Sequence, residues 1–242
     1  MKFAVIGGTG LIGSQVVKNL NAAGHEAVPH SQSTGVDVIT GKGLDEAVAG
    51  ADVLVNLTNS PTFDKDSLAF FQTSMDNLLA AGRKGGIRHF VILSIVGVDK
   101  VPELDYYKAK VLQEDILAAG PIPYSIVRAT QFMEFMDATM SWTTDGDTVR
   151  LPPTPIQPIA AEDVADAVAE VAAGAPLGGI RNIGGPEVFT LDELGRITLS
   201  HKSDGRTVVT DPTAGMFAAV KGDVLTDKNA HLAPTRYADW LS

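Results

Sequence analysis

The sequence predicts an α/β fold built on a doubly wound parallel sheet, and two observations lead to this prediction. Short apolar runs of strand length alternate with longer stretches in which apolar residues recur at helical spacing. The first run, Lys2–Ile6, is hydrophobic almost throughout, as a strand covered on both faces requires. Right-handed βαβ crossovers join such elements into a parallel sheet with helices on both faces.

The first 130 residues supply the elements of this sheet in order. Six strands are expected, at Lys2–Ile6, His25–His30, Val36–Ile39, Val53–Leu57, Phe90–Ser94 and Tyr124–Arg128. Four helices are expected between them, at Leu11–Leu20, Leu44–Val48, Ser67–Ala81 and Tyr106–Ala119. Glycines at positions 24, 82 and 120 follow three of these helices and are read as their stop signals.

The alternation changes after Thr130. Helices are expected at 132–140, 163–173 and 191–200, with a proline-rich loop at 152–158 and short strands around Val149 and Ile183. No linker is long enough to separate two independent domains. The sequence therefore predicts one compact unit, in which residues 1–150 form the core and residues 151–242 a small C-terminal α/β cap that contacts substrate.

Composition excludes several classes of function. The 242 residues include no cysteine, so disulfides, thiolate metal sites and cysteine nucleophiles are excluded, and the histidines show no metal-ligand spacing. A net charge of −10 repels nucleic acid and anionic membranes. The longest nearly apolar run, Phe90–Val98, is too short for a membrane span, and Lys2–Ile6 is too short for a signal peptide. We therefore expect a cytoplasmic protein without a metal.

A glycine-rich turn lies between the first strand and the first helix. Residues 7–13, with the sequence GGTGLIG, satisfy both G-x-x-G-x-x-G and G-x-G-x-x-G. Glycine lets the backbone approach a pyrophosphate, and the helix N-terminus offers free N–H donors and partial positive charge. The placement predicts a dinucleotide on a Rossmann-type core, against the alternative of a turn that binds nothing. The expected contacts are Gly7, Thr9, Gly10, Leu11, Ile12 and Gly13.

The end of the second strand bears on the choice of cofactor. NAD enzymes hold the ribose 2′-hydroxyl with an acidic residue about 20 residues past the glycines, but His30, Ser31 and Ser33 stand here. A carboxylate about 4 Å from a 2′-phosphate would cost roughly 4 kcal/mol at an effective dielectric of 20. The segment thus favours NADP(H), with NAD(H) as the alternative; the serines are otherwise plain loop residues.

Two further segments are candidates for the adenosine end of the cofactor. Asp37 could accept a bond from the adenine amino group, or serve only as a turn residue. Thr58 and Asn59 follow the strand that ends near Leu57, at the carboxyl edge where open α/β sheets bind ligands.

Candidate catalytic residues follow the fifth strand. Ser94 closes that strand, while Tyr106 and Lys110 are four residues apart and share a helix face. An ammonium near a phenol favours the phenolate, and a serine hydroxyl can hold a substrate oxygen. The alternative is an exposed lysine beside core tyrosines.

These residues resemble the short-chain dehydrogenase/reductase superfamily, through the glycine turn, Ser94, and the Y-x-x-x-K of Tyr106 and Lys110. Four stretches are similar to its atypical NmrA-like branch: 93–97 (LSIVG), 106–110 (YYKAK), 128–132 (RATQF) and 183–187 (IGGPE). The resemblance implies a nicotinamide near Ser94, Lys110, Ala129, Thr130 and Gln131. Two departures stand out. Tyr107 competes with Tyr106, and Ile95 follows Ser94 where relatives often have a second serine.

The segment after the sixth strand is rich in methionine and aromatic residues. The resemblance implies that Phe132, Phe135 and Met136 form an apolar wall over the nicotinamide, suited to an apolar or aromatic small molecule. Ordinary cap core is the alternative.

Three functions are compatible with these features. The first is an NAD(P)H-dependent reductase of a small carbonyl, quinone or conjugated compound. The second is a non-catalytic NADP(H)-binding redox sensor of the NmrA type that contacts a partner protein. The third, a nucleotide-sugar epimerase, ranks last because the cap has few arginines to hold a diphosphate.

Overall fold

The computed structural model describes residues 1–242, and these divide into two compact units. Unit 1 contains residues 1–94, 105–128 and 164–181, and unit 2 contains residues 95–104, 129–163 and 182–242. Both units are discontinuous in sequence, whereas the sequence suggested one division at residue 150. That single boundary remains a prediction.

Unit 1 is built around the parallel sheet that the sequence predicts, which confirms the fold class. Its strands are β1 (Lys2–Ile6), β2 (Glu26–His30), β3 (Val53–Asn56), β4 (His89–Ile95), β5 (Tyr124–Ala129) and β9 (Gly179–Gly184). The whole sheet has seven strands in the order β12-β9-β5-β4-β3-β1-β2, and β12 (His231–Leu232) pairs in parallel with the end of β9. The strand order reverses beside β1, where the glycine turn begins.

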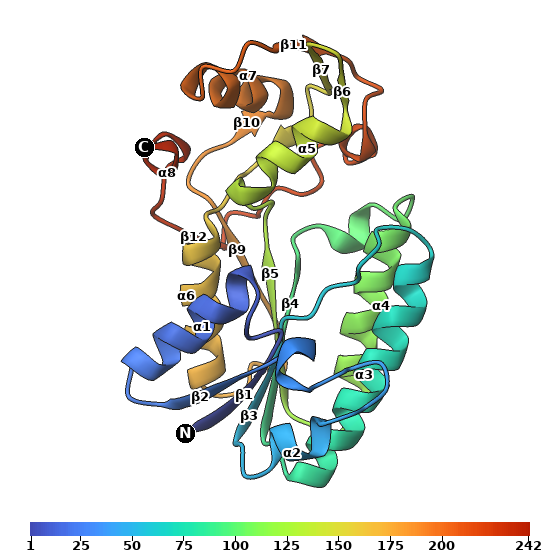
Figure 1. The fold of residues 1–242 in the computed structure, drawn as a ribbon, viewed down its shortest axis with the longest axis vertical. Helices are drawn as coiled ribbons and strands as arrows, with labels where there is room; N and C mark the ends of the chain where they lie inside the picture. Colours follow the sequence, from blue (N-terminus) through green and yellow to red (C-terminus); the bar gives the residue numbers. More distant parts are fainter. The chain divides into compact units, whose positions relative to one another are not determined.

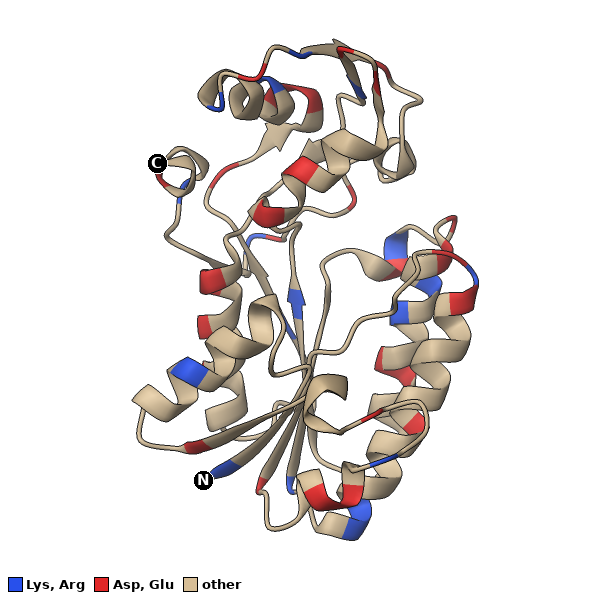
Figure 2. Ribbon diagram, in the orientation of Figure 1, with Lys and Arg blue, Asp and Glu red and all other residues tan.

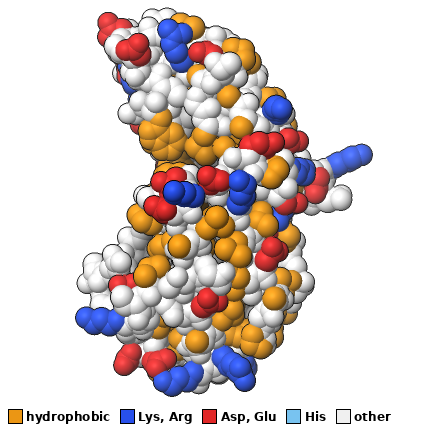
Figure 3. All heavy atoms as spheres, turned by 90° about the vertical axis from the view of Figure 1, so that its right-hand side faces the viewer, with side chains coloured by type: hydrophobic (Ala, Val, Ile, Leu, Met, Phe, Trp, Pro, Cys, Tyr) orange, Lys and Arg blue, Asp and Glu red, His pale blue; other side chains and the backbone are white.

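Helices cover both faces of this sheet (Figure 1). On one side lie α1 (Leu11–Ala22) and α6 (Ala161–Ala173), and on the other α2 (Leu44–Val48), α3 (Asp66–Gly85) and α4 (Asp105–Ala119). Charged residues lie mainly on the helices and loops, while the strands carry few (Figure 2). Figure 3 shows the α3–α4 side, where apolar side chains remain exposed between charged ones.

The prediction of a strand at Val36–Ile39 is wrong. Val36 and Val38 are buried in the core of unit 1, which explains their alternating pattern, but the segment is a turn. The Oδ1 atom of Asp37 accepts hydrogen bonds from the backbone of Ile39 (2.8 Å) and Thr40 (3.3 Å), which closes the turn. Burial of two alternate valines produces the two-residue period of a strand, although the segment pairs with no other strand.

The third predicted helix is longer than expected. Helix α3 continues to Gly85, and Gly86 ends it in the left-handed region at φ +74°. Gly82, predicted as the stop, lies inside the helix, where a Cβ would come within 3.0 Å of Ile122 Cδ1. Gly82 thus permits close packing of α3 on the chain before β5 and does not terminate the helix.

Unit 2 has its own core and two small sheets. Its helices are α5 (Met136–Trp142), α7 (Leu191–His201) and α8 (Tyr237–Leu241). One sheet has the order β11 (Thr207–Thr210), β7 (Thr148–Leu151) and β6 (Thr144–Asp145); β8 (Pro155–Ile156) and β10 (Phe189–Thr190) form the other. Strand β8 falls in the segment predicted as a proline-rich loop. None of the protein's helices combines the length and apolar character that crossing a bilayer requires.

Candidate cofactor and active site

The turn between β1 and α1 is packed too closely for any residue but glycine at three positions. Gly7 has φ +79°, and a Cβ there would lie 2.8 Å from the carbonyl carbon of Leu57. A Cβ at Gly8 would approach Val5 O to 2.6 Å, and one at Gly13 would approach Gly7 O to 2.1 Å. The absence of a side chain at Gly13 therefore lets the first turn of α1 pack directly on the turn that follows β1.

The same turn leaves backbone donors for a ligand. The amides of Gly7 and Gly8 are already used, since both donate to His30 O at 2.8 and 3.1 Å. The first i→i−4 bond of α1 runs from Ser14 N to Gly10 O, and no side chain caps this helix. The N–H groups of the first turn thus lack intrahelical acceptors, and Thr9 to Leu11 are exposed. These residues fit a pyrophosphate.

Hydroxyl groups gather where β2 ends. The Oγ atoms of Ser31 and Ser33 lie 2.8 Å apart, and Thr34 Oγ1 accepts a 2.8 Å bond from Ser31 N. Burial lowers the pKa of His30, so its imidazole is neutral at pH 7 and able to donate one hydrogen bond. The segment between residues 30 and 36 contains neither a carboxylate nor a guanidinium.

The other residues predicted for the adenosine end differ in their surroundings. Asp37 is engaged with its own turn, and the amide of Ile39 holds the pKa of its carboxyl below the usual range. Thr58 N and Oγ1 donate to Asn56 Oδ1 at 3.0 and 2.7 Å, and a Cβ added to Gly7 would lie 3.0 Å from Thr58 N. The structure therefore brings Thr58 next to Gly7, and an adenine contact by Asp37 stays a prediction.

Lys110 lies in the interior, anchored to the strand that carries Ser94. Its Nζ donates to Leu93 O at 2.8 Å and to Gln113 Oε1, and lies 4.8 Å from the centre of the Phe71 ring. Burial lowers the pKa of Lys110 to about 7, although the Glu114 carboxylate opposes the shift. The neighbouring Ser94 Oγ is buried without any hydrogen-bond partner. A buried hydroxyl without a partner is uncommon and is suited to a ligand oxygen.

Tyr106 is bonded to a residue that the sequence assigned to cofactor binding. Its hydroxyl donates to Asn59 Oδ1 at 2.6 Å, and it makes no hydrogen bond to Ser94 or Lys110. Burial raises the pKa of Tyr106 to about 12, so the phenol stays protonated at neutral pH. Tyr107, the competing tyrosine, is also buried.

Six predicted site residues belong to unit 2. Ala129 O accepts a bond from Val96 N, and Thr130 N donates to Ile183 O. The hydroxyl of Thr130 and the side-chain amide of Gln131 are buried without hydrogen-bond partners. These groups are therefore able to bond to a ligand. The rings of Phe132 and Phe135 stack with centroids 5.5 Å apart, and Phe135 is 49% exposed.

Met136 differs from the two phenylalanines. It is only 4% exposed and belongs to the core of unit 2, together with Met133 and Met140. Its surroundings match the alternative of cap core more closely than a pocket wall.

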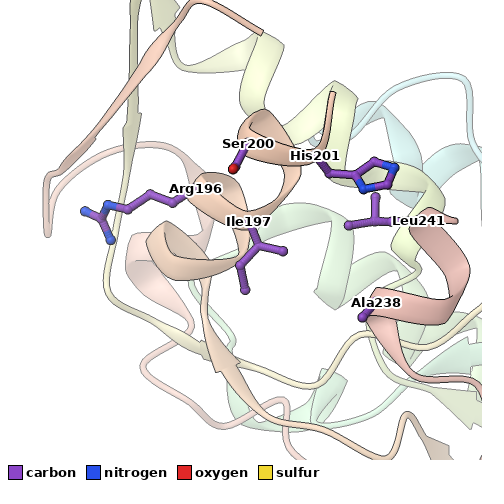
Figure 4. A pocket seen from close by; sticks show the side chains of 6 residues that line it. All are labelled: Arg196, Ile197, Ser200, His201, Ala238 and Leu241. Atoms are coloured by element: carbon purple, nitrogen blue, oxygen red, sulfur yellow. The ribbon is translucent and has the colours of Figure 1, made fainter. Parts of the chain in front are cut away.

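A separate, open surface pocket of about 520 Å³ lies in unit 2 (Figure 4). Residues of α7 and α8 line it: Arg196, Ile197, Ser200, His201, Ala238 and Leu241. It contains none of the predicted site residues. No group of three or more His, Cys, Asp or Glu side chains in the protein is placed to hold a metal ion.

The sequence did not indicate three polar residues near Lys110, namely Gln113, Glu114 and Arg128. Gln113 stands three positions after Lys110, and that helical spacing could have indicated it. Glu114 and Arg128 form a bidentate ion pair at 2.9 and 2.6 Å, and both side chains are at least 88% buried. Their pairing across 14 positions carries no local pattern.

Comparisons with known proteins agree with the dinucleotide binding that the glycine turn predicts. Residues 7–174 match a family model described as NAD(P)H-binding. Over 174 residues the chain is 30% identical to the chloroplastic divinyl chlorophyllide a 8-vinyl-reductase of Cucumis sativus, covering 59% of this chain and 41% of that protein. Over 151 residues it is 27% identical to the photosystem II assembly factor Ycf39 of Synechocystis, covering 55% and 46%. The chain spans less than half the length of these relatives.

Solved structures share the fold over almost the whole chain. The NADPH complex of an NADPH-dependent quinone oxidoreductase from Escherichia coli has a TM-score of 0.75 at 18% identity and covers 100% of this chain and 98% of that one. The protein MoeE5, solved with UDP-glucuronic acid and NAD, has a TM-score of 0.78 at 17% identity, covering 99% and 96%. At such identities the likeness shows the fold.

Proposed function

This chain belongs to the NAD(P)H-binding family, and on that basis we propose that it is an NADPH-dependent reductase of a small apolar carbonyl compound, quinone or related conjugated molecule. The observation that carries the proposal is the buried Lys110 amine anchored beside Ser94, whose hydroxyl has no partner within the protein. Two relatives whose names describe reduction, a vinyl reductase and a quinone oxidoreductase, support the reaction class.

In this proposal the residues of unit 1 divide the work of binding. The first-turn amides of α1 hold the pyrophosphate, and Ser31, Ser33 and His30 donate to a 2′-phosphate. The absence of a carboxylate between residues 30 and 36 favours NADPH over NADH.

The chemical roles follow from the state of each side chain. NADPH, when bound, supplies hydride. The Ser94 hydroxyl donates to the substrate oxygen, and the Lys110 cation favours the negative charge that develops there. Tyr106 holds the proton for that oxygen and must exchange its bond to Asn59 to release it. The exposed ring of Phe135, stacked on Phe132, suits an apolar or aromatic substrate.

One observation favours a second candidate, a redox sensor that binds NADP(H) without turnover. The Tyr106 hydroxyl donates to Asn59 and makes no hydrogen bond to Ser94 or Lys110. A protein that only binds NADP(H) does not need these three side chains to be in contact. The name of the relative Ycf39, an assembly factor, describes no reaction.

The two candidates are separated by incubating the purified protein with NADPH and a panel of quinones, aldehydes and conjugated ketones. Acceptor-dependent NADPH oxidation is expected, and Lys110→Ala should abolish it while NADPH affinity stays within about tenfold, because loss of turnover alone marks a chemical role. Tight NADPH binding with no oxidation by any acceptor would favour the sensor. Full activity of Lys110→Ala would reject the role of that residue.

A further inference from the structure

A chain of polar contacts in the interior links Lys110 to Thr58 through Gln113, Met75 and Asn56, and no motif singled out Gln113 or Met75. Lys110 Nζ donates to Gln113 Oε1, and Gln113 Nε2 contacts Met75 Sδ at 3.9 Å. The same sulfur receives Asn56 Nδ2 at 3.7 Å, and Asn56 Oδ1 accepts two bonds from Thr58. Helix α4 is thereby linked through α3 to the end of β3, where the cofactor is expected.

The chemistry of its two neighbours fixes the side chain of Gln113 in one orientation. An ammonium has only donors, so the amide atom beside Lys110 must be the oxygen. A thioether is only an acceptor, so the amide atom beside Met75 must be the nitrogen. Gln113 and Met75 are fully buried, which excludes water as a substitute for either neighbour. A flipped amide would place donor against donor and leave the sulfur without a donor.

We propose that Gln113 is a positioning residue that holds the Lys110 side chain against the Leu93 carbonyl, next to Ser94, with Met75 fixing its orientation. The expected effect of Gln113 on turnover rests on the proposed reductase function. The contact between Gln113 and Lys110 does not, because it is present in the protein without cofactor.

Gln113 is the side chain whose oxygen accepts a hydrogen bond from Lys110, whereas the buried Ser94 hydroxyl makes no hydrogen bond. Around Lys110 and Gln113, helix α3 places the Phe71 ring and the Met75 thioether, and β4 places the Leu93 carbonyl. Glu114, the acidic residue one turn beyond Lys110, is engaged by Arg128 of β5 through two hydrogen bonds. The remaining titratable neighbour, Tyr106 on the same helix, is protonated and donates to Asn59.

Two substitutions of Gln113 act on Lys110 in opposite directions. Gln113→Glu puts a carboxylate beside the amine and should raise the pKa of Lys110 by about one to three units. Gln113→Met keeps the length and removes the acceptor, so the pKa should fall. Met75→Leu keeps the core volume and removes only the sulfur acceptor, so it should give a smaller fall in a protein that folds normally.

The primary measurement is the titration of the Lys110 side chain, followed by NMR of ¹³C-lysine-labelled protein without cofactor and assigned with Lys110→Arg. Gln72→Glu is the matched control, since Gln72 lies on α3 but is exposed and bonded to Asp76. This control should leave the Lys110 titration unchanged. Unchanged Lys110 titration in Gln113→Met and Met75→Leu, both folded, would overturn the proposal.

Turnover supplies the second reading. The alkaline limb of the pH profile of kcat should move with the NMR titration, upward in Gln113→Glu and downward in Gln113→Met, while the KM for NADPH changes by less than about threefold. Shifted titrations in a protein that never oxidises NADPH would support the contact and reject the reductase function. Normal turnover with unshifted titrations would reject the role of Gln113 and leave the function standing.

Discussion

The side-chain nitrogen of Lys110 lies 2.8 Å from the carbonyl oxygen of Leu93, so α4 is tied to β4 at the residue just before Ser94. The lysine is only 4% exposed, and its amine has exchanged water for a carbonyl, an amide oxygen and an aromatic face. This desolvation destabilises the charged form of Lys110. The fold nevertheless keeps the lysine here, bonded to the carbonyl of the residue before Ser94, and the Ser94 hydroxyl has no hydrogen-bond partner.

Replacing Lys110 by methionine should alter stability in a pH-dependent way. Burial lowers the pKa of Lys110 from 10.5 to about 7, so between these values the unfolded chain binds more protons than the folded protein. The contribution of Lys110 to the free energy of unfolding therefore rises with pH in that window, by about 1.4 kcal/mol per unit. The advantage of Lys110→Met over the parent should be largest below pH 7 and shrink toward pH 10. Urea unfolding at several pH values measures it, and a difference independent of pH would contradict the burial of a chargeable amine.

Removing the hydroxyl of Tyr106 tests the proposed proton donor. With a pKa near 12 the phenol is protonated throughout the working range, so its loss should lower kcat by roughly 10²-fold without changing the pH of the alkaline limb. Tyr107→Phe is the matched control and should retain kcat within about threefold. If Tyr106→Phe is fully active, the proton comes from water and the bond to Asn59 is structural.

A carboxylate at the end of β2 should reverse the proposed preference for NADPH over NADH. Ser31→Asp places a negative charge where the 2′-phosphate is expected, so NADPH should bind roughly 10- to 100-fold more weakly after allowance for screening by salt. NADH, which lacks that phosphate, should keep its affinity within about threefold or gain. Isothermal titration with both nucleotides gives the ratio. An equal loss for both would mean that Ser31 does not face the 2′ position.

The closest packing in the glycine turn gives a further prediction. Gly13→Ala would place a Cβ 2.1 Å from Gly7 O, so α1 must move away from the turn and its first amides with it. NADPH affinity should fall roughly 10- to 100-fold, in line with the loss of one or two charge-assisted hydrogen bonds. Gly205→Ala is the control, because nothing lies within 4 Å of its added Cβ. Unchanged affinity in Gly13→Ala would separate the turn from binding.

Much of unit 1 was predictable because its determinants are local. The bounds of β1 agree with the prediction, and the glycine turn follows directly on it, since a buried strand, a tight turn and an amphipathic helix each have a short-range pattern. The strand expected at Val36–Ile39 failed because burial of alternate valines has the same period whether or not a partner strand is present. Pairing is a long-range property that a single run does not contain.

The interior of the site was less predictable than its motif. Spacing makes Ser94, Tyr106 and Lys110 candidates, but the partner of Tyr106 is 47 positions away and that of Gln113 is 38 positions away. Nothing in the sequence indicates that a phenol reaches Asn59 or that a methionine sulfur accepts two amides. The division into interleaved units is likewise set by how distant segments pack.

The proposed function depends on binding of the pyrophosphate of a nicotinamide dinucleotide by the turn from Gly7 to Gly13. The most direct test is a crystal structure of the protein grown with saturating NADPH. We expect pyrophosphate oxygens within hydrogen-bond distance of the first amides of α1, and the 2′-phosphate next to Ser31 and Ser33. NADPH bound elsewhere with this turn empty, or no NADPH bound at all, would contradict it.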